Sequence, residues 1–223
     1  MESKIGLNSG ARKKILVLGA SQGIGALCVK AALAEGHSVT AFARTPSKLD
    51  LTHAKLTKVT GNFHNKASVH DAVKNHDAVI ICASSTSLKG FKEKPDYFSS
   101  GTKFCIDAMK EHSVKRLVVL SAHGVGDSYH AASWLQRTLL IGGLLKNVFR
   151  DHDVQERMVR ESGLDFVIAR PTRLNNGKAK GKFTRTTELK FLSSSISRAD
   201  VAAFLIESCE SQAFVGKAVE LCG

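Results

Sequence analysis

The sequence lacks the cysteine patterns that stabilise secreted domains or bind zinc. Its five cysteines are widely spaced, none forms a C-x-x-C pair, and the count is odd (Cys28, Cys82, Cys105, Cys209 and Cys222). A disulfide framework needs an even set, and zinc sites built from cysteine need closely spaced pairs. We therefore expect free thiols, no metal site and a reducing compartment, namely the cytoplasm.

Long apolar runs are also missing. Residues 1–6 lack the apolar core of a signal peptide. The longest candidate for a membrane span, residues 138–145, is far shorter than the roughly 20 apolar residues that cross a bilayer. We expect no membrane span.

Runs of five or more basic residues are absent, although the formal net charge is +12. Scattered lysines and arginines indicate a solvated surface with a cleft for an anionic ligand, whereas nucleic-acid binding uses clustered ones. We expect a small-molecule substrate and no nucleic-acid partner, with a basic patch assembled in three dimensions as the alternative. A protein partner or a homodimer stays open.

Short apolar runs alternate with helical stretches along the 223 residues. We expect strands over 14–18, 38–43, 55–60, 78–83, 116–121, 164–169 and 217–221, with an extended segment over 182–189. We expect helices over 24–35, 45–49, 66–75, 96–112, 133–149, 151–162 and 197–209. This alternation predicts an α/β fold with a doubly wound parallel sheet and helices on both faces. One domain over 13–223 would follow a flexible lead-in over 1–12.

A glycine turn joins the first strand to the first helix. Gly19, Gly23 and Gly25 follow the apolar run 15–18 directly and lead into an Ala/Leu-rich helix. A helix N-terminus attracts phosphate, and glycines let a pyrophosphate approach the backbone. A glycine turn that only connects the two elements is the alternative. The turn supplies six candidate cofactor contacts: Gly19, Ser21, Gln22, Gly23, Ile24 and Gly25.

The end of the second strand carries Arg44 where folds that prefer NAD usually place an acidic residue. A guanidinium can hold a 2′-phosphate through two hydrogen bonds. Arg44 therefore favours NADP(H) over NAD(H), with a plain surface arginine as the alternative. The remaining candidate cofactor contacts lie at later strand ends: Asn62, Phe63, Cys82, Ala83, Ser84, Ser121 and Pro171.

Together these motifs resemble the atypical short-chain dehydrogenase/reductases, the NAD(P)H-binding group that includes NmrA-like proteins and biliverdin IXβ/flavin reductase. The resemblance covers residues 13–221 and is carried by the segments 19–25, 43–49, 77–80, 118–121, 160–166, 170–171 and 196–202. It implies a Rossmann fold and a nicotinamide cofactor. Members range from reductases to cofactor-sensing proteins, so it does not identify the substrate.

Catalytic groups are harder to identify. Typical enzymes of this superfamily use a tyrosine and a lysine four residues apart, and this pair is missing at both Tyr97 and Tyr129. Ser121 stands where the family serine falls, and His152 matches an Asp-His motif of the biliverdin/flavin reductase branch. These two are the catalytic candidates, with a surface position for His152 and a helix-capping role for Asp151 as the alternatives.

The missing Tyr-Lys pair leaves the activity open between classes. We expect an NADPH-dependent reductase of a small or planar acceptor, of flavin, quinone or carbonyl type. A protein that senses NADP(H) and regulates a partner without turnover is the second hypothesis, and a nucleic-acid-associated member the third. An apolar stripe from Trp134 to Leu145 is interpreted as core packing, with a lid or a partner-binding helix as the alternative.

Overall fold

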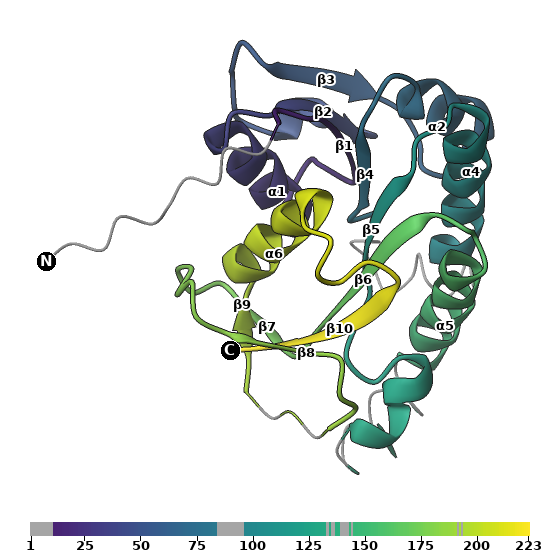
Figure 1. Ribbon diagram of the computed structural model, residues 1–223, viewed down its shortest axis with the longest axis vertical. Coiled ribbons are helices and arrows are strands. Elements are labelled where there is room, and N and C mark those ends of the chain that lie inside the picture. Colours follow the sequence, from purple (N-terminus) through teal and green to yellow (C-terminus); the bar gives the residue numbers. More distant parts are fainter. Residues whose placement is uncertain are drawn as a thin grey trace, which may run out of the picture.

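The computed structural model describes residues 11–83, 96–132, 134, 137–138, 143, 145–190, 192 and 194–223. The lead-in predicted over 1–12 lies outside this set apart from its last two residues. The described chain forms one central sheet covered by helices on both faces (Figure 1). This is the predicted doubly wound α/β fold.

The central sheet has eight strands in the order β3-β2-β1-β4-β5-β6-β10-β8. The strands are β1 (Lys14–Leu18), β2 (Ser38–Ala43), β3 (Leu56–Thr60), β4 (Ala78–Ile81), β5 (Arg116–Leu120), β6 (Asp165–Pro171), β8 (Thr184–Thr186) and β10 (Lys217–Cys222). The chain leaves β1 toward β2 on one side and later returns to β4 on the other. A crevice opens at such a reversal, beyond the carboxyl ends of β1 and β4.

The helices are α1 (Gly23–Ala34), α2 (Lys66–Val73), α4 (Tyr97–Glu111), α5 (Lys146–Arg160) and α6 (Arg198–Glu210), with short 3-10 turns η1 (Pro46–Lys48) and η2 (Gly126–Ala131). Helices α1 and α6 cover one face of the sheet, and α2, α4 and α5 cover the other (Figure 1). Among the described residues, no helix is both long and apolar enough to cross a bilayer.

Side chains of the central strands alternate between two apolar cores. In β1, Ile15 and Val17 pack into the core under α1 and α6, whereas Leu16 and Leu18 pack into the core under α2 and α4. All four are fully buried. Successive strand residues point to opposite faces, so a strand covered on both sides reads as a continuous apolar run.

The helix α6 begins at the predicted capping box. Ser197 Oγ accepts a hydrogen bond from the N–H of Asp200 at 2.9 Å and donates to its carboxylate at 2.7 Å. The same carboxylate accepts from the N–H groups of Lys180 and Gly181, each at 2.9 Å. The cap therefore also holds a loop that is distant in sequence.

Several elements differ from the sequence-based expectation. Strand β8 pairs antiparallel with β10, at the edge of an otherwise parallel sheet. A second, two-stranded sheet joins β7 (Leu174–Asn175) to β9 (Ile196–Ser197). Such short strands carry no periodic signal. The helix expected over 151–162 begins earlier, at Lys146, and runs through Arg150 without a break.

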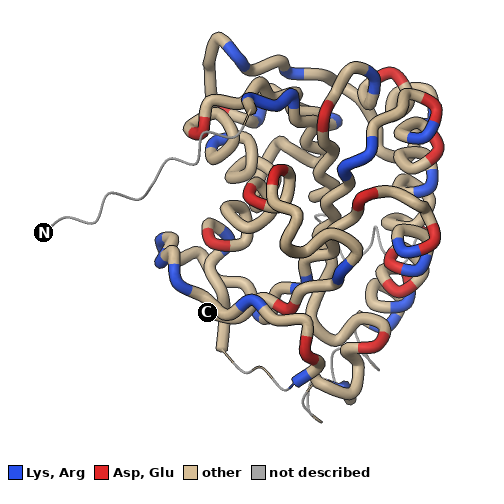
Figure 2. Tube along the Cα trace, viewed as in Figure 1, with Lys and Arg blue, Asp and Glu red and all other residues tan. Residues whose placement is uncertain are grey.

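Lysine and arginine alternate with aspartate and glutamate along α4 and α5 (Figure 2). Trp134 is 72% exposed, so the interpretation of the apolar stripe as core packing is wrong at this residue. Most other members of that stripe lie outside the described residues.

Candidate cofactor site

A cavity of about 710 Å³ lies beyond the carboxyl ends of β1, β2 and β4. This volume falls within the range of about 300–1,000 Å³ that is usual for small-molecule sites. The cavity is lined by the glycine turn and by Phe42, Ala43, Arg44, Thr45, Lys48, Gly61, Asn62, Phe63, Cys82, Ala83, Tyr97, Leu120, Leu174 and Arg198.

The glycine turn is built by close backbone contacts. Gly19 has a φ of +89°, and a Cβ there would stand 2.6 Å from Cα of Ala83. A Cβ on Gly25 would overlap the carbonyl oxygen of Gly19. The N–H of Gly19 donates to the carbonyl of Phe42 at 2.9 Å, which ties the turn to β2. Only glycine fits at positions 19 and 25 without moving this backbone.

The N-terminus of α1 opens onto this cavity. Its N-cap residue, Gln22, makes no capping hydrogen bond through its side chain, and the first turn contains no acidic residue. The first N–H groups of a helix have no partner within the helix, and the helix dipole makes this end positive. A pyrophosphate fits both properties.

The far wall of the cavity is basic and aromatic. Arg44 and Lys48 are exposed at the end of β2 and line the cavity. Tyr97 lies at the start of α4, with its ring 4.4 Å from the ring of His64. Burial raises the pKa of Tyr97, and the nearby charge of Arg44 partly offsets this rise. Arg44 therefore lies close enough to Tyr97 for its charge to act on a residue that lines the same cavity.

The third strand ends in a turn that shapes the floor. Asn62 Oδ1 accepts from the N–H of His64 at 3.0 Å. Phe63 is 5% exposed, and a Cβ on Gly101 of α4 would overlap its ring. Phe63 thus forms an apolar wall, while the side-chain carbonyl of Asn62 stabilises the turn.

Most of the predicted cofactor residues meet at this cavity. Gly19, Ser21, Gln22, Gly23, Ile24, Arg44, Asn62, Phe63, Cys82 and Ala83 all line it. Gly25 supports the turn from below. Ser121 and Pro171 do not line it, and Ser84 lies outside the described residues.

Sequence inspection missed Tyr97, Leu174 and Arg198 as cavity residues. Tyr97 opens a helix, Leu174 stands in a two-residue strand, and Arg198 is the first residue of α6. None of the three directly follows a strand of the central sheet, whereas the cofactor contacts predicted from the sequence lie only at the ends of such strands and in the glycine turn. The capping box at Ser197 marks the position of Arg198, but only the fold brings α6 beside α1.

The two catalytic candidates are held by other side chains. Ser121 is 5% exposed, and its hydroxyl donates to Glu156 at 2.6 Å. His152 stacks on Phe98 with ring centroids 3.8 Å apart and bonds to Gln155 through Nδ1. Burial lowers the pKa of His152 to about 4, although the bond to Gln155 raises it slightly. Their catalytic roles stay predictions.

Two alternatives for the Asp151-His152 pair are wrong. His152 is 8% exposed and not a surface residue. Asp151 lies inside α5 and does not cap it. Its carboxylate instead accepts from the N–H groups of Phe98 at 2.5 Å and Ser99 at 3.1 Å, at the N-terminus of α4. Burial raises the pKa of Asp151, and these bonds partly offset the rise.

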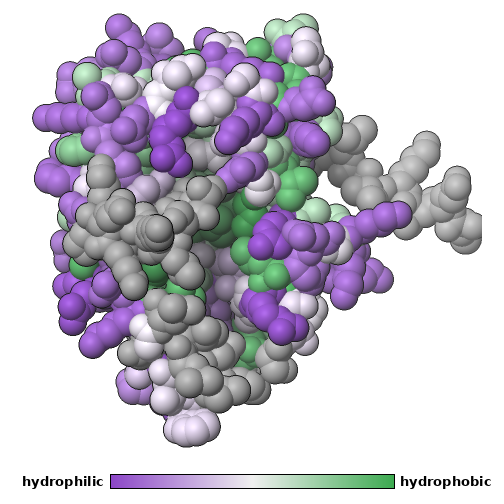
Figure 3. Space-filling view, turned by 180° about the vertical axis from the view of Figure 1, so that it is seen from behind, coloured by the Kyte–Doolittle hydropathy of each residue, from purple (hydrophilic) through white to green (hydrophobic). Residues whose placement is uncertain are grey.

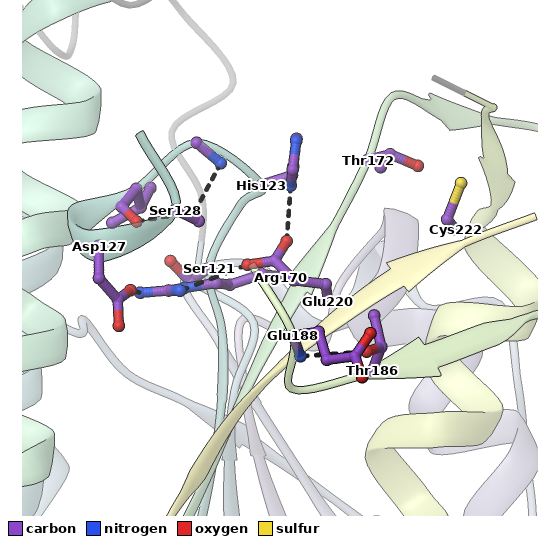
Figure 4. Close-up of polar contacts among 12 residues, drawn as sticks. Ser121, His123, Asp127, Ser128, Arg170, Thr172, Thr186, Glu188, Glu220 and Cys222 are labelled. Atoms are coloured by element: carbon purple, nitrogen blue, oxygen red, sulfur yellow. Dashed lines mark hydrogen bonds and ion pairs between the residues drawn. The ribbon is translucent and has the colours of Figure 1, made fainter. Parts of the chain in front are cut away.

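A buried ionic network joins the ends of β5, β6 and β10 (Figure 4). Arg170, 1% exposed, donates to Glu156 through Nε at 2.9 Å, to Glu220 at 3.3 Å, and pairs with Asp127. Burial lowers the pKa of Arg170, but Glu156 and Asp127 raise it well above its usual range. Arg170 therefore carries a permanent charge.

The five cysteines are free, as predicted, and all five are buried. Burial raises the pKa of Cys105 to about 12. Among the described residues, no cluster of three His, Cys, Asp or Glu side chains is placed to hold a metal ion. On the face seen from behind, apolar side chains lie in a hollow, with hydrophilic residues above it and along one side (Figure 3).

Known proteins resemble this chain over nearly its whole length. The yeast UPF0659 protein YMR090W from Saccharomyces cerevisiae is 29% identical over 206 residues, which cover 87% of this chain and 86% of the relative. The structure of ChuY, an anaerobillin reductase from Escherichia coli O157:H7, has a TM-score of 0.76 at 22% identity and covers 94% of this chain and 96% of its own.

A short-chain dehydrogenase/reductase from Veillonella parvula, solved in complex with NADP, has a TM-score of 0.78 at 19% identity, over 95% of this chain and 94% of its own. At these identities the structural likenesses establish the fold. The family model described as NAD(P)H-binding matches residues 19–212, from the first glycine of the turn to two residues past the end of α6. By this match, together with the glycine turn and the cavity that it lines, the chain belongs to the NAD(P)H-binding family.

Proposed function

We propose that this protein is an NADPH-dependent reductase of a small or planar acceptor, of flavin, quinone or carbonyl type. The observation that carries the proposal is a single cavity with the open N-terminus of α1 at one wall and Arg44 at another. These walls suit the pyrophosphate and the 2′-phosphate of NADPH, respectively.

In this proposal, different residues of the cavity bind different parts of the cofactor. Gly19 and Gly25 leave room for the pyrophosphate against the backbone, where the first N–H groups of α1 would donate to it. Arg44, assisted by Lys48, would hold the 2′-phosphate. When bound, the cofactor supplies a hydride, and the protein supplies position and electrostatics.

The other end of the cavity suits the acceptor. Leu120, the last residue of β5, and Leu174 of β7 line this end and give it apolar walls. Apolar walls with few polar groups favour a flat, conjugated molecule that packs by its faces. Holding such an acceptor against the cofactor is itself a large part of catalysis.

The cofactor preference is tested by calorimetry with NADPH and NADH on the native protein and on Arg44→Ala. Loss of a charge-assisted contact to the 2′-phosphate should weaken NADPH binding roughly 10- to 100-fold and leave NADH binding unchanged. Arg157→Ala, an exposed change on α5 whose side chain is 63% exposed, is the matched control. Equal affinity of the native protein for both cofactors would contradict the preference.

Turnover is tested by NADPH oxidation with FMN, menadione and 4-nitrobenzaldehyde. A rate above the blank with at least one acceptor is expected. Tight NADPH binding with no turnover would instead favour a regulatory protein that senses NADP(H). The observation that favours this second function is that Ser121 and His152 bond to protein groups and do not line the cavity.

A further inference from the structure

His123 lies three residues beyond the end of β5 and has one bound and one unbound ring nitrogen. Its Nδ1 lies 2.6 Å from Oε2 of Glu220, and the two side chains are 3% and 1% exposed. Its Nε2 is buried and has no hydrogen-bond partner within the described part of the chain. Burying a polar atom without a partner is unfavourable, and a ligand that binds there is one reason for a native protein to retain such an atom.

Glu220 determines which ring nitrogen of His123 exchanges its proton. A carboxylate only accepts hydrogen bonds, so the short contact places a hydrogen on Nδ1 of His123. The nitrogen that gains or loses a proton is then Nε2. A histidine oriented by a carboxylate, with its other nitrogen unbound, is suited to general acid–base catalysis.

A network of buried charges adjoins the pair. Glu220 also accepts from Arg170 at 3.3 Å, and the network continues from Arg170 into η2 and α5. Arg160 belongs to the same network and lies 3.6 Å from the carboxylates of Asp127 and Glu156. The described network contains three carboxylates and two guanidinium groups (Asp127, Glu156, Glu220, Arg160 and Arg170), and His123 joins it through Glu220.

The pair stands at the edge of the sheet where the acceptor is expected. The N–H of His123 donates to the carbonyl of Pro171 at 3.0 Å, which holds it against the end of β6. The same two strands lead to Leu120 and Leu174 in the cavity wall. Figure 4 shows His123 on the same side of the strand ends as Thr172. Ligands of open α/β sheets bind beyond these carboxyl ends.

We propose that His123, positioned by Glu220, donates the proton that accompanies hydride transfer to the acceptor. This inference rests on the proposed reductase function. The acceptor takes a hydride from the reduced nicotinamide dinucleotide at one atom and a proton from Nε2 at an oxygen or nitrogen. The Nε2–H bond breaks, the dinucleotide is left oxidised, and His123 regains its proton from water. Because Nε2 is buried, the acceptor reaches it only after a local opening at this edge.

The kinetic test compares His123→Gln with His130→Gln, a change at an exposed histidine on η2. With the acceptor that the native protein reduces, His123→Gln should lower kcat by about 100-fold or more, in line with the usual contribution of a general acid. In the native protein kcat should fall as the pH rises, because a general acid must carry its proton, and this fall should be absent from His123→Gln. The affinity of the variant for NADPH should change less than about twofold. Glu220→Gln should lower kcat without changing NADPH binding, and His130→Gln should match the native protein.

A spectroscopic test needs no turnover. In protein with ¹⁵N-labelled histidine, adding NADP⁺ and menadione should shift the Nε2 resonance of His123 and leave that of His130 unchanged. The His123→Asn variant assigns the signal if His123→Gln does not fold. An unchanged kcat and pH profile in His123→Gln would overturn the inference while the reductase function stands. If no acceptor is reduced, the reductase function fails, and a His123 signal that menadione leaves unchanged overturns the inference as well.

Discussion

At the scale of single residues, the glycine turn shows two different requirements for glycine. Gly19 needs both its positive φ of +89° and the absence of a Cβ, whereas Gly25 needs only the absence of a Cβ. At Gly19 the space is limited by the backbone of Cys82 and Ala83, just after β4, and at Gly25 it is limited by the carbonyl of Gly19. In the proposed function, the affinity for a pyrophosphate therefore depends on positions that make no contact through a side chain.

We expect Gly25→Ala to weaken NADPH binding and to lower stability by about 1–3 kcal/mol, because the added methyl group must displace the carbonyl of Gly19. Gly163→Ala is the matched control. It has a φ of +72° and open space around the added methyl, so it should cost about 1–2 kcal/mol and leave binding unchanged. Calorimetry and chemical unfolding measure both effects. Full NADPH affinity in Gly25→Ala would contradict this account.

At the scale of elements, two helices on the same face of the sheet are joined by a cap. Asp96, the N-cap residue of α4, makes no capping bond through its side chain, and Asp151 of α5 supplies the acceptors instead. The residues are separated by more than fifty positions in sequence. Because Tyr97 stands at this helix end and lines the cavity, the cap also sets one wall of the site.

Asp151→Ala should cost about 1–2 kcal/mol of stability, the usual effect of losing a helix cap. It should also speed amide hydrogen exchange at Phe98 and Ser99, because their N–H groups lose their acceptors. Asp151→Asn keeps one carbonyl acceptor and should cost less. Asp153→Ala, on the same helix with a side chain that is 40% exposed, should change neither measurement. Native exchange rates at Phe98 in Asp151→Ala would refute the cap.

At the scale of the whole molecule, Arg170 joins the interior of the sheet to elements around it. It reaches α5, β10 and η2 from β6, and it carries its charge while only 1% exposed. A buried charge is tolerated only when it is paired and hydrogen-bonded. Removing Arg170 would leave Glu156 with only Ser121 and Arg160, and Glu220 with only His123, among the described contacts of these buried carboxylates.

Arg170→Met should therefore destabilise the protein by about 3–5 kcal/mol, the range for breaking a buried ion pair on one side. Arg157→Met, which removes an exposed pair with Asp153, should cost less than about 1 kcal/mol. Denaturant unfolding of the two variants provides the comparison. If both lose equally little stability, the network does not hold these elements together.

Much of the fold followed from patterns that are local in sequence. Apolar runs with β-branched residues predicted the strands, and the Ser197–Asp200 capping box predicted the start of α6. The antiparallel β8 and the pairing of β7 with β9 were not predicted, because segments of two or three residues show no periodicity. In α5, the break expected near Arg150 was wrong, because packing against α4 overrides weak local signals.

The sequence by itself determined the strand, glycine turn and helix that begin the fold, since these depend on neighbouring residues and on the backbone freedom of glycine. It also placed Arg44 at the end of β2 and allowed the family to be identified. Only the tertiary structure decided which distant side chains meet: Tyr97 and Arg198 at the cavity, Asp151 at the start of α4, and His123 against Glu220. Such contacts join residues tens of positions apart, and their geometry depends on how the helices pack on the sheet.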